Sequence, residues 1–539
     1  VAGPLSVYGG AITINSGVSL TATNSRITLQ GTAGKTVGGS TSGALTANEL
    51  LLLGGNINLP NASNLIGTVA ASGVGSLTYV DSNALTIGTV GATSGIDASG
   101  NISVSTRTGD LTLGAGVTTT NSGASASILL NAGASAAPGT ATGGNLVISG
   151  SPALSVGSGG RISLMTGSLA GSTGLTSLSG LTAGTGRFRY NADESTNFAS
   201  SWINPISGFA GGAWTNLSSG VYGIYRELPT AITLDNINQV ITYGESFALS
   251  TTPTGLLNGD TFTQTVTGAV YSSGRINANA TPYTITSNLT GLGYSVSANT
   301  LTVNRKALTI SGLTATSKVY NANTSASVSG TAVLQAAVAS GTRNDGKPYT
   351  GDTVSLTGTA VGNFNTKDVL TANTVSFTGL SLTGAQAGNY SLTPHANATT
   401  PRITAKALTV SGLSSANKVY DGTTSATING TATLQTALAA GAGTSSDGKA
   451  YTIDDVTLTG TAVGNFNTKD VLTANTVAFT GLSLTGTGVA NYTLTPHASA
   501  SQIITPKPLS ITTPSIASKV YDGSTAAGVL TLGTLSGLV

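Results

Sequence analysis

The 539-residue chain contains no cysteine, which excludes disulfide bonds and thiolate metal sites. Charged residues are scarce as well: Asp, Glu, Lys and Arg make up 7% of the chain, against about 25% in a typical soluble protein. The net charge of +2 arises from 21 basic and 19 acidic residues, with neither a basic stripe nor an acidic tail. The charge pattern therefore gives no indication of binding to nucleic acids or to anionic membranes.

Long hydrophobic runs are also missing. No apolar run approaches the ~20 residues that a transmembrane helix needs, and ELLLLGG at residues 49–55 is among the longest. The chain starts at Val1 without a basic and apolar leader, so we expect any secretion signal to lie outside this sequence. Because 39% of the residues are hydrophobic and recur in short strings, we expect a folded protein of several domains.

The clearest feature that is present is a long internal repeat. The block 355–384 recurs at 457–486 with only two changes, where Ser355 and Ser376 are replaced by Thr457 and Ala478. The motif that opens each unit begins at Lys306, Lys406 and Lys507. Similarity at a long, fixed period indicates tandem copies of one module. We therefore predict small β domains at 306–405 and 406–506 and the truncated start of a third at 507–539, so that the chain is expected to be a piece of a longer one.

Residues 228–305 resemble a shorter version of the same module. The string QVITYGESFALST places Tyr243 where the later copies have the Tyr of their KVY motif, at Tyr320, Tyr420 and Tyr521. We predict a further β domain over 228–305.

Residues 1–186 carry short alternating strings such as NISVS, DLTLGAG, SILLNAG and NLVISG. Many of them are evenly spaced, as in those that start at positions 110, 127, 145 and 161, and they are interrupted by Gly, Asn or Ser. This spacing is typical of the coils of a parallel β-solenoid, in which each coil stacks its inward apolar side chains on the next. A low-complexity linker is the alternative, but linkers do not keep apolar positions in register. We predict an all-β protein: a right-handed parallel β-helix or solenoid followed by tandem β domains of sandwich or β-grasp type.

Residues 187–227 differ from both neighbours because they hold both tryptophans, Trp202 and Trp214, and further aromatic residues. The end of a solenoid exposes unpaired backbone groups that must be covered. We predict that this segment is an aromatic cap and junction. The alternative is that its aromatic rings stack on sugars.

Catalytic and metal-binding patterns are weak. The two histidines, His395 and His497, stand at the same position of two repeats, which favours a structural role. Residues 1–180 hold only four carboxylates, without the pairing that a polysaccharide-cleaving enzyme needs. The loops NDGKPYTGD and SDGKAYTIDD lack a calcium-binding spacing, and we interpret them as solvated hairpin loops. We expect no enzyme, no metal and no cofactor.

The KVYDGTT motif predicts a strand, a tight turn and a second strand. An Asp-Gly pair supplies positive φ at both central positions of a hairpin turn, so we interpret Asp421, Gly422, Asp522 and Gly523 as turn residues. The first copy has Asn321-Ala322 instead, which predicts a looser turn or a turn of another type. Lys406 and Lys418 are expected at strand ends, where they deter edge-to-edge pairing.

These features together resemble the large filamentous-haemagglutinin-type exoproteins exported by two-partner secretion. KVYDGTT resembles the signature of the YDG domain, and ITYGESFAL with NGDTF resembles the MBG domain of the YGX type. The resemblance implies a secreted adhesin at the bacterial cell surface and an outer-membrane secretion partner.

Three functions follow from these observations. The first is an elongated stalk or spacer of an adhesin, in cell adhesion or a biofilm matrix. The second is a module that binds a glycan, an exopolysaccharide or a cell surface, with Trp202, Trp214, Tyr349 and Tyr451 as contact residues. The third and least expected is a carbohydrate-active β-helix enzyme.

Overall fold

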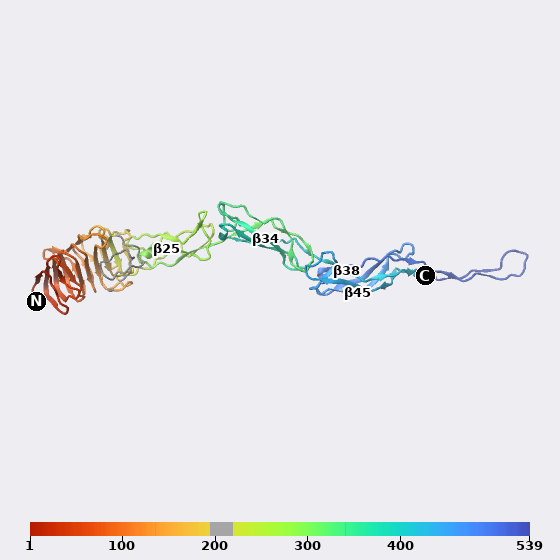
Figure 1. The fold of residues 1–539 in the computed structure, drawn as a ribbon, viewed down its shortest axis with the longest axis horizontal. Helices are drawn as coiled ribbons and strands as arrows, with labels where there is room; N and C mark the ends of the chain where they lie inside the picture. Colours follow the sequence, from red (N-terminus) through yellow and green to blue (C-terminus); the bar gives the residue numbers. More distant parts are fainter. Residues whose placement is uncertain (135, 195–218, 340) are drawn as a thin grey trace. The chain divides into compact units, whose positions relative to one another are not determined.

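The computed structural model describes residues 1–134, 136–194, 219–339 and 341–539 (Figure 1). Within these ranges the chain is all-β, and its helices are short 3-10 turns of three to five residues. This confirms the predicted all-β class. None of the helices in these ranges is long and apolar enough to span a membrane. The chain forms two compact units, Val1–Tyr271 with Ile276–Asn304, and Ser272–Arg275 with Arg305–Val539.

The first unit contains two large parallel sheets, whose strands lie side by side in Figure 1, red to yellow. The first sheet consists of β1 (Leu5–Gly9), β2 (Ser19–Gly31), β4 (Ala44–Leu53), β6 (Leu65–Val74), β11 (Ile96–Ala98), β14 (Val117–Thr119) and β17 (Leu154–Ser155), with β8 (Leu85–Ile87), β13 (Leu111–Leu113) and β16 (Leu146–Ile148) beside them. The second has the order β19 (Phe188–Arg189), β20 (Gly220–Tyr225), β18 (Arg161–Thr166), β15 (Ser127–Ala132), β12 (Ile102–Thr106), β7 (Leu77–Asp81), β5 (Asn56–Leu59) and β3 (Thr36–Gly38).

The evenly spaced strings do not pair with their nearest neighbours in sequence. β13, β15, β16 and β18 come in this order along the chain but alternate between the two sheets. Paired strands are about twice as far apart in sequence, as in Leu111 with Leu146 and Ile128 with Ile162. The spacing therefore measures the step from one sheet to the other, and our interpretation of it as the stacking period was wrong.

In-register pairing stacks like side chains on one another. Leu77, Ile102, Ile128 and Ile162 follow each other across four paired strands, and each is at most 2% exposed. Fully burying such a side chain contributes about 1.5–3 kcal/mol. The core of this region therefore consists of rows of stacked aliphatic side chains. Burial of these rows stabilises the fold without charged residues.

The part of the first unit that follows residue 228 contains a four-stranded mixed sheet. Its order is β21 (Gln239–Thr242), β26 (Asn299–Asn304), β25 (Tyr283–Ser287) and β22 (Gln264–Thr267). β21 and β26 are parallel, whereas β25 pairs antiparallel with both of its neighbours.

The two repeats of the second unit share one topology. Their longest elements are antiparallel pairs, β34 (Ser355–Phe364) with β35 (Val375–Thr383) and β45 (Thr457–Phe466) with β46 (Val477–Thr485), and each pair has its register shift at the same place. A parallel pair opens each repeat: β27 (Lys306–Leu308) with β36 (Tyr390–Leu392), and β38 (Lys406–Ser411) with β47 (Tyr492–Thr495). A second parallel pair closes it: β30 (Lys318–Val319) with β37 (Ile403–Thr404), and β40 (Lys418–Val419) with β48 (Ile504–Thr505).

Shorter ladders complete each repeat. In the first repeat they join β28 (Ile310–Ser311) to β33 (Val333–Leu334), β29 (Thr314–Ala315) to β32 (Val328–Ser329) and β31 (Ser325–Ala326) to β34. In the second they join β38 to β43 (Thr433–Leu438), β39 (Ser414–Ser415) to β42 (Ile428–Asn429), β41 (Ser425–Ala426) to β45 and β43 to β44 (Lys449–Tyr451).

Residues 507–539 form two of these ladders again. β49 (Ser510–Ile511) pairs with β52 (Leu535–Ser536), and β50 (Ser515–Ile516) pairs with β51 (Leu530–Thr531). They correspond to β28 with β33 and to β29 with β32 of the first repeat. This segment thus has the local pairing with which a repeat begins.

Candidate functional site: the junction between the two repeats

The KVYDGTT turn differs from the expected hairpin. The strands on its two sides pair with different partners, since β40 is parallel to β48 whereas β41 is antiparallel to β45. Positive φ occurs at Gly422 (80°) and Gly523 (78°) but not at the preceding aspartates. The prediction of a hairpin with positive φ at both positions was therefore wrong.

The carboxylate of Asp421 has a different task. Its Oδ1 accepts hydrogen bonds from the backbone N–H of Thr423 at 2.9 Å and from Lys418 Nζ at 2.8 Å. Lys418 Nζ also donates to the carbonyl oxygens of Thr423 and Ser425. The hydrogen bond from Lys418, together with those from Thr423, lowers the pKa of Asp421 to about 2. Lysine and aspartate thus fix the turn from within, which is more than the edge protection that we expected of Lys418.

The first copy keeps the shape of this turn without its charge pair. Ala322 has φ 62°, in the left-handed region that Gly422 occupies, so the looser turn that we expected is not found. Lys318 Nζ donates at 2.8 Å to the carbonyl oxygen and to the side-chain oxygen of Asn323. Burial without a carboxylate partner lowers the pKa of Lys318 to about 8.

Lys306 and Lys406, which open the repeats, are fully buried. Each lies 2.8 Å from an aspartate, Asp345 and Asp447 respectively. Their ammonium groups also lie over the rings of Tyr349 and Tyr451, at 4.0 and 4.3 Å from the ring centres. The expectation that Lys406 protects a strand edge was therefore wrong, because it is an internal ion-pair partner.

Tyr349 and Tyr451 are accordingly not surface residues. They are 1% and 2% exposed, and the backbone N–H of each donates to a second buried tyrosine, Tyr390 and Tyr492, at 2.9 Å. We expected both tyrosines in exposed loops, where they could contact a glycan, and this expectation was wrong. The other two candidates, Trp202 and Trp214, lie outside the described residues.

The junction between the repeats is centred on Tyr320. Its side chain is fully buried, and its hydroxyl donates to the carboxylate of Asp454 in the second repeat, at 3.0 and 2.8 Å from the two oxygens. The hydroxyl of Tyr492 donates to the same carboxylate at 2.6 Å. The rings of Tyr451 and Tyr492 meet the ring of Tyr320 edge-on, at centroid distances of 5.8 and 5.4 Å. One buried carboxylate therefore holds a tyrosine from each repeat.

A second set of contacts lies beside this carboxylate. Lys367 of the first repeat lies 3.7 Å from Asp454 and 2.8 Å from its own neighbour Asp368. Asn491 of the second repeat accepts a hydrogen bond from the backbone N–H of Val369 at 2.9 Å and donates to Asp368 at 3.1 Å. These contacts give polar groups on both sides of the junction a partner in the other repeat.

The charges of the junction stabilise one another. Burial, followed by the hydrogen bond to Asp454, raises the pKa of Tyr320 well above its usual value. The hydrogen bond to Asp368 raises the pKa of Lys367, and the hydrogen bond from Lys367 lowers the pKa of Asp368. At neutral pH Tyr320 therefore remains a hydrogen-bond donor, while Lys367 and Asp368 are charged.

The other predicted signature residues occupy related positions. The backbone N–H groups of Tyr243, Tyr320 and Tyr420 donate to Asn304, Thr404 and Thr505, each two residues before the next repeat lysine. The three tyrosines therefore share one backbone environment, as the sequence comparison predicted for Tyr243. Tyr521 is 92% exposed, and near it Asp522 accepts hydrogen bonds from Lys519 and Ser524.

A second buried carboxyl group joins the strand region around Tyr190 to the domain predicted at residues 228–305. Asp260, from the NGDTF string, accepts hydrogen bonds from the hydroxyls of Tyr190 at 2.9 Å and Tyr294 at 2.8 Å. The rings of Tyr190 and Tyr225 stack at 5.6 Å. Burial raises the pKa of Asp260, although the two hydroxyls and Arg189 act to lower it. Sequence reasoning missed this role of Asp260, because its partner Tyr190 is 70 residues away.

Over the described ranges, no three His, Asp or Glu side chains gather closely enough to hold a metal ion. His395 and His497 each lie edge-on to a phenylalanine, at 5.0 and 4.9 Å.

Fold and junction together define a modular all-β protein in which one repeat is joined to the next by buried side chains. The family model of the YDG domain matches residues 304–400 and 404–500. The chain therefore contains two YDG domains in tandem, which confirms that part of the predicted resemblance. No curated protein and no solved structure matches the chain.

Proposed function

We propose that this chain is a fragment of a secreted bacterial surface adhesin and acts as an elongated stalk or spacer, in cell adhesion or a biofilm matrix. The observation that carries the proposal is the junction, where the buried Tyr320 contacts Asp454 of the next repeat. A spacer needs neighbouring modules that hold one another, because freely jointed modules collapse into a coil. Binding and catalysis do not require such contacts between repeats.

Residues 1–186 would serve the same purpose as a right-handed parallel β-helix. The in-register parallel pairing of β7, β12, β15 and β18 supports this proposal. Its handedness follows from the general rule, since parallel strands joined by a crossover are right-handed in about 98% of cases. Such stacking lets length grow by duplication without a new core.

The family assignment that we propose is the filamentous-haemagglutinin type, with residues 228–305 as an MBG domain. The two YDG domains support it, as does the backbone environment that Tyr243 shares with Tyr320 and Tyr420. On this proposal the protein is extracellular and is exported through an outer-membrane secretion partner, and the stalk carries a region that contacts a glycan, an exopolysaccharide or a cell surface.

Small-angle X-ray scattering on the full chain tests the spacer proposal. We expect a maximum dimension that stays constant between low and high salt, because the junction contacts are buried and little screened. A double variant of the junction, Tyr320→Phe with Asp454→Asn, should broaden the distribution of distances, whereas the surface variant Asp97→Asn should not. A compact particle, or a junction variant that scatters like the parent, would contradict the proposal.

A glycan array with the same full chain tests the competing function. The matched variant is Trp202→Ala with Trp214→Ala. Binding that disappears in this variant while the circular dichroism spectrum is retained would replace the spacer by a glycan-binding module. Absence of binding in both proteins is the result that a spacer predicts.

A further inference from the structure

The second repeat carries the same docking residues as the first. Tyr420, Lys469, Asp470 and Val471 form what we term the Tyr420 face. They correspond to Tyr320, Lys367, Asp368 and Val369, with which the first repeat contacts the second. Lys469, Asp470 and Val471 belong to the nearly identical block at 457–486.

The two faces differ in what covers them. Tyr320 is fully buried, whereas Tyr420 is only partly buried and lines a pocket of about 520 Å³. Lys469 and Asp470 are 53% and 64% exposed, against 35% and 47% for Lys367 and Asp368. In the part of the chain that the structure describes, the Tyr420 hydroxyl and the Val471 N–H have no hydrogen-bond partner, while their counterparts contact Asp454 and Asn491.

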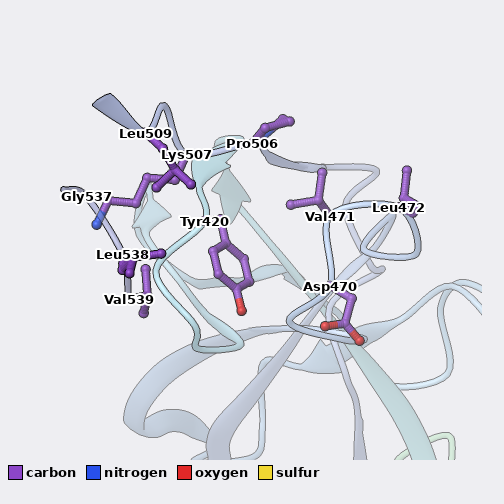
Figure 2. Close-up of a pocket in the computed structure, with 10 residues that line it drawn as sticks. All are labelled: Tyr420, Asp470, Val471, Leu472, Pro506, Lys507, Leu509, Gly537, Leu538 and Val539. Atoms are coloured by element: carbon purple, nitrogen blue, oxygen red, sulfur yellow. The ribbon is translucent and has the colours of Figure 1, made fainter. Parts of the chain in front are cut away.

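The pocket is lined by the ring of Tyr420, whose counterpart Tyr320 meets two tyrosine rings in the first junction. Figure 2 shows the ring of Tyr420 at its centre, with Asp470 and Val471 on one side and Leu538 and Val539 on the other. Its walls therefore combine apolar side chains with the carboxylate of Asp470, which lies 3.2 Å from Lys469. Two tyrosine rings, a carboxylate and an asparagine would complete it, as they complete the first junction.

The chain also leaves the second repeat in the same way as it leaves the first. Tyr320 N donates to Thr404 O at 2.8 Å, and Tyr420 N donates to Thr505 O at 2.9 Å. Lys406 and Lys507 follow two residues after these acceptors. Residues 507–539 then form the two short ladders with which a YDG repeat begins.

We propose that the Tyr420 face is the docking surface for a further YDG repeat that continues from Lys507 in the same chain. The docked repeat presents counterparts of Tyr451, Asp454, Asn491 and Tyr492. Its aspartate accepts the hydrogen bond of Tyr420, and its asparagine accepts that of Val471 N–H. This inference concerns the junction between repeats and does not depend on the adhesin role.

The test extends the full chain after Val539 with a second copy of residues 439–506, which completes the repeat that starts at Lys507. Hydrogen exchange of the Val471 amide is measured with and without the extension. We expect it to slow about tenfold or more when the new hydrogen bond forms. The Val369 amide, protected in both proteins, is the internal reference.

Two variants make the test specific. Tyr420→Phe should leave the unfolding midpoint of the 539-residue chain unchanged but should lower that of the extended chain, as Tyr320→Phe does in both. Asp454→Asn placed only in the appended copy should remove this difference.

Three outcomes would overturn the proposal. One is an exchange rate of Val471 that the extension does not change, whether the added residues fold elsewhere or stay unfolded. Another is a Tyr420→Phe variant that behaves alike in both chains. The third is protection of Val471 in the unextended chain that rises with protein concentration, since the occupant is then a second molecule.

Discussion

The hydroxyl of Tyr320 donates to both oxygens of the Asp454 carboxylate, at 3.0 and 2.8 Å, although 134 residues separate the two in sequence. The same carboxylate also accepts a hydrogen bond from the hydroxyl of Tyr492, which belongs to the same repeat as Asp454. Its counterpart in the first repeat, Asp352, accepts in the same way from Tyr390 at 2.5 Å. One Tyr–Asp pair therefore lies within each repeat, and in the second repeat Tyr320 of the preceding repeat uses the same aspartate as its acceptor.

Removal of the Tyr320 hydroxyl should weaken this junction. We expect Tyr320→Phe to lower the free energy of unfolding of the second unit by about 1–2 kcal/mol, because a hydrogen bond to a charged group is lost while the ring remains. Urea denaturation followed by circular dichroism measures the change.

A double-mutant cycle with Asp454→Asn separates this contact from other effects. Two residues in direct contact should show a coupling energy of about 0.5–3 kcal/mol. The control is Tyr283→Phe, which removes a hydroxyl that donates within the first unit, to Asn277 O. Additive effects of Tyr320→Phe and Asp454→Asn would contradict the direct contact.

The sequence predicted the repeats because duplication leaves its mark residue by residue, as in the block at 355–384 and 457–486. It also predicted the strands of the first unit, because the alternation of apolar and polar residues marks the inward face of a strand. Pairing was harder to predict. Strings that follow one another alternate between two sheets, so their spacing gives the step between sheets and not the period of stacking.

The roles of individual side chains were less accessible. Lys406 was interpreted as an edge residue because lysine is almost never fully buried unless it is paired, and its partner Asp447 lies in a distant loop. Tyr349 and Tyr451 were placed in solvated loops because a lysine lies inside each of these strings, at Lys347 and Lys449. One signal could have found them: the lysine, the aspartate and the tyrosine recur together in both repeats.

The first repeat lacks the charge pair that fixes the turn of the second, and it can be restored. In Asn321→Asp the new carboxylate takes the position of Asp421, next to Lys318. We expect a gain of about 0.5–1 kcal/mol at pH 7 and a rise in the pKa of Lys318 from about 8.

The pH dependence provides a second readout of this change. A lysine whose folded pKa is lowered leaves the folded state with fewer protons than the unfolded state, so stability rises with pH between about 8 and the usual value near 10.4. Asn321→Asp should flatten this rise. The matched control is Asp421→Asn, which should destabilise the second repeat, and an Asn321→Asp variant as stable as the parent would contradict the argument.

The left-handed backbone conformation at position 422 should make glycine more stable there than alanine. Gly422→Ala places a Cβ at φ 80°, where an L-residue costs about 1–2 kcal/mol more than in its usual conformation. The added atom would also approach Val539 Cγ1 to 2.8 Å, which a flexible terminal side chain can avoid. We expect a loss of about 1 kcal/mol by thermal unfolding.

The reverse change at the matched position of the first repeat is the control. Ala322→Gly relieves the same strain at φ 62° but removes a methyl group that is 6% exposed, and burial of such a group contributes about 0.8 kcal/mol. The two effects should nearly offset each other. A Gly422→Ala variant as stable as the parent would show that the turn changes its conformation.

The buried Asp260 should give the first unit a pH dependence of its own. Because burial raises its pKa in the folded state, the folded state holds a proton that the unfolded state, with a pKa near 3.9, has already lost. Its contribution to stability is therefore fully present below about pH 4 and is lost as the pH rises through the folded pKa. Asp260→Asn should remove this fall in stability, because asparagine has no charge to bury yet can still accept a hydrogen bond from Tyr190 or Tyr294.

The measurement is urea denaturation between pH 3 and 7 for the parent, for Asp260→Asn and for the exposed control Asp97→Asn. Only the difference between the curves is interpreted, because other carboxylates titrate in the same range. If stability depends on pH in the same way in the parent and in Asp260→Asn, then Asp260 has the same pKa in the folded and the unfolded state. The hydrogen bonds from Tyr190 and Tyr294 would then fully compensate for its burial.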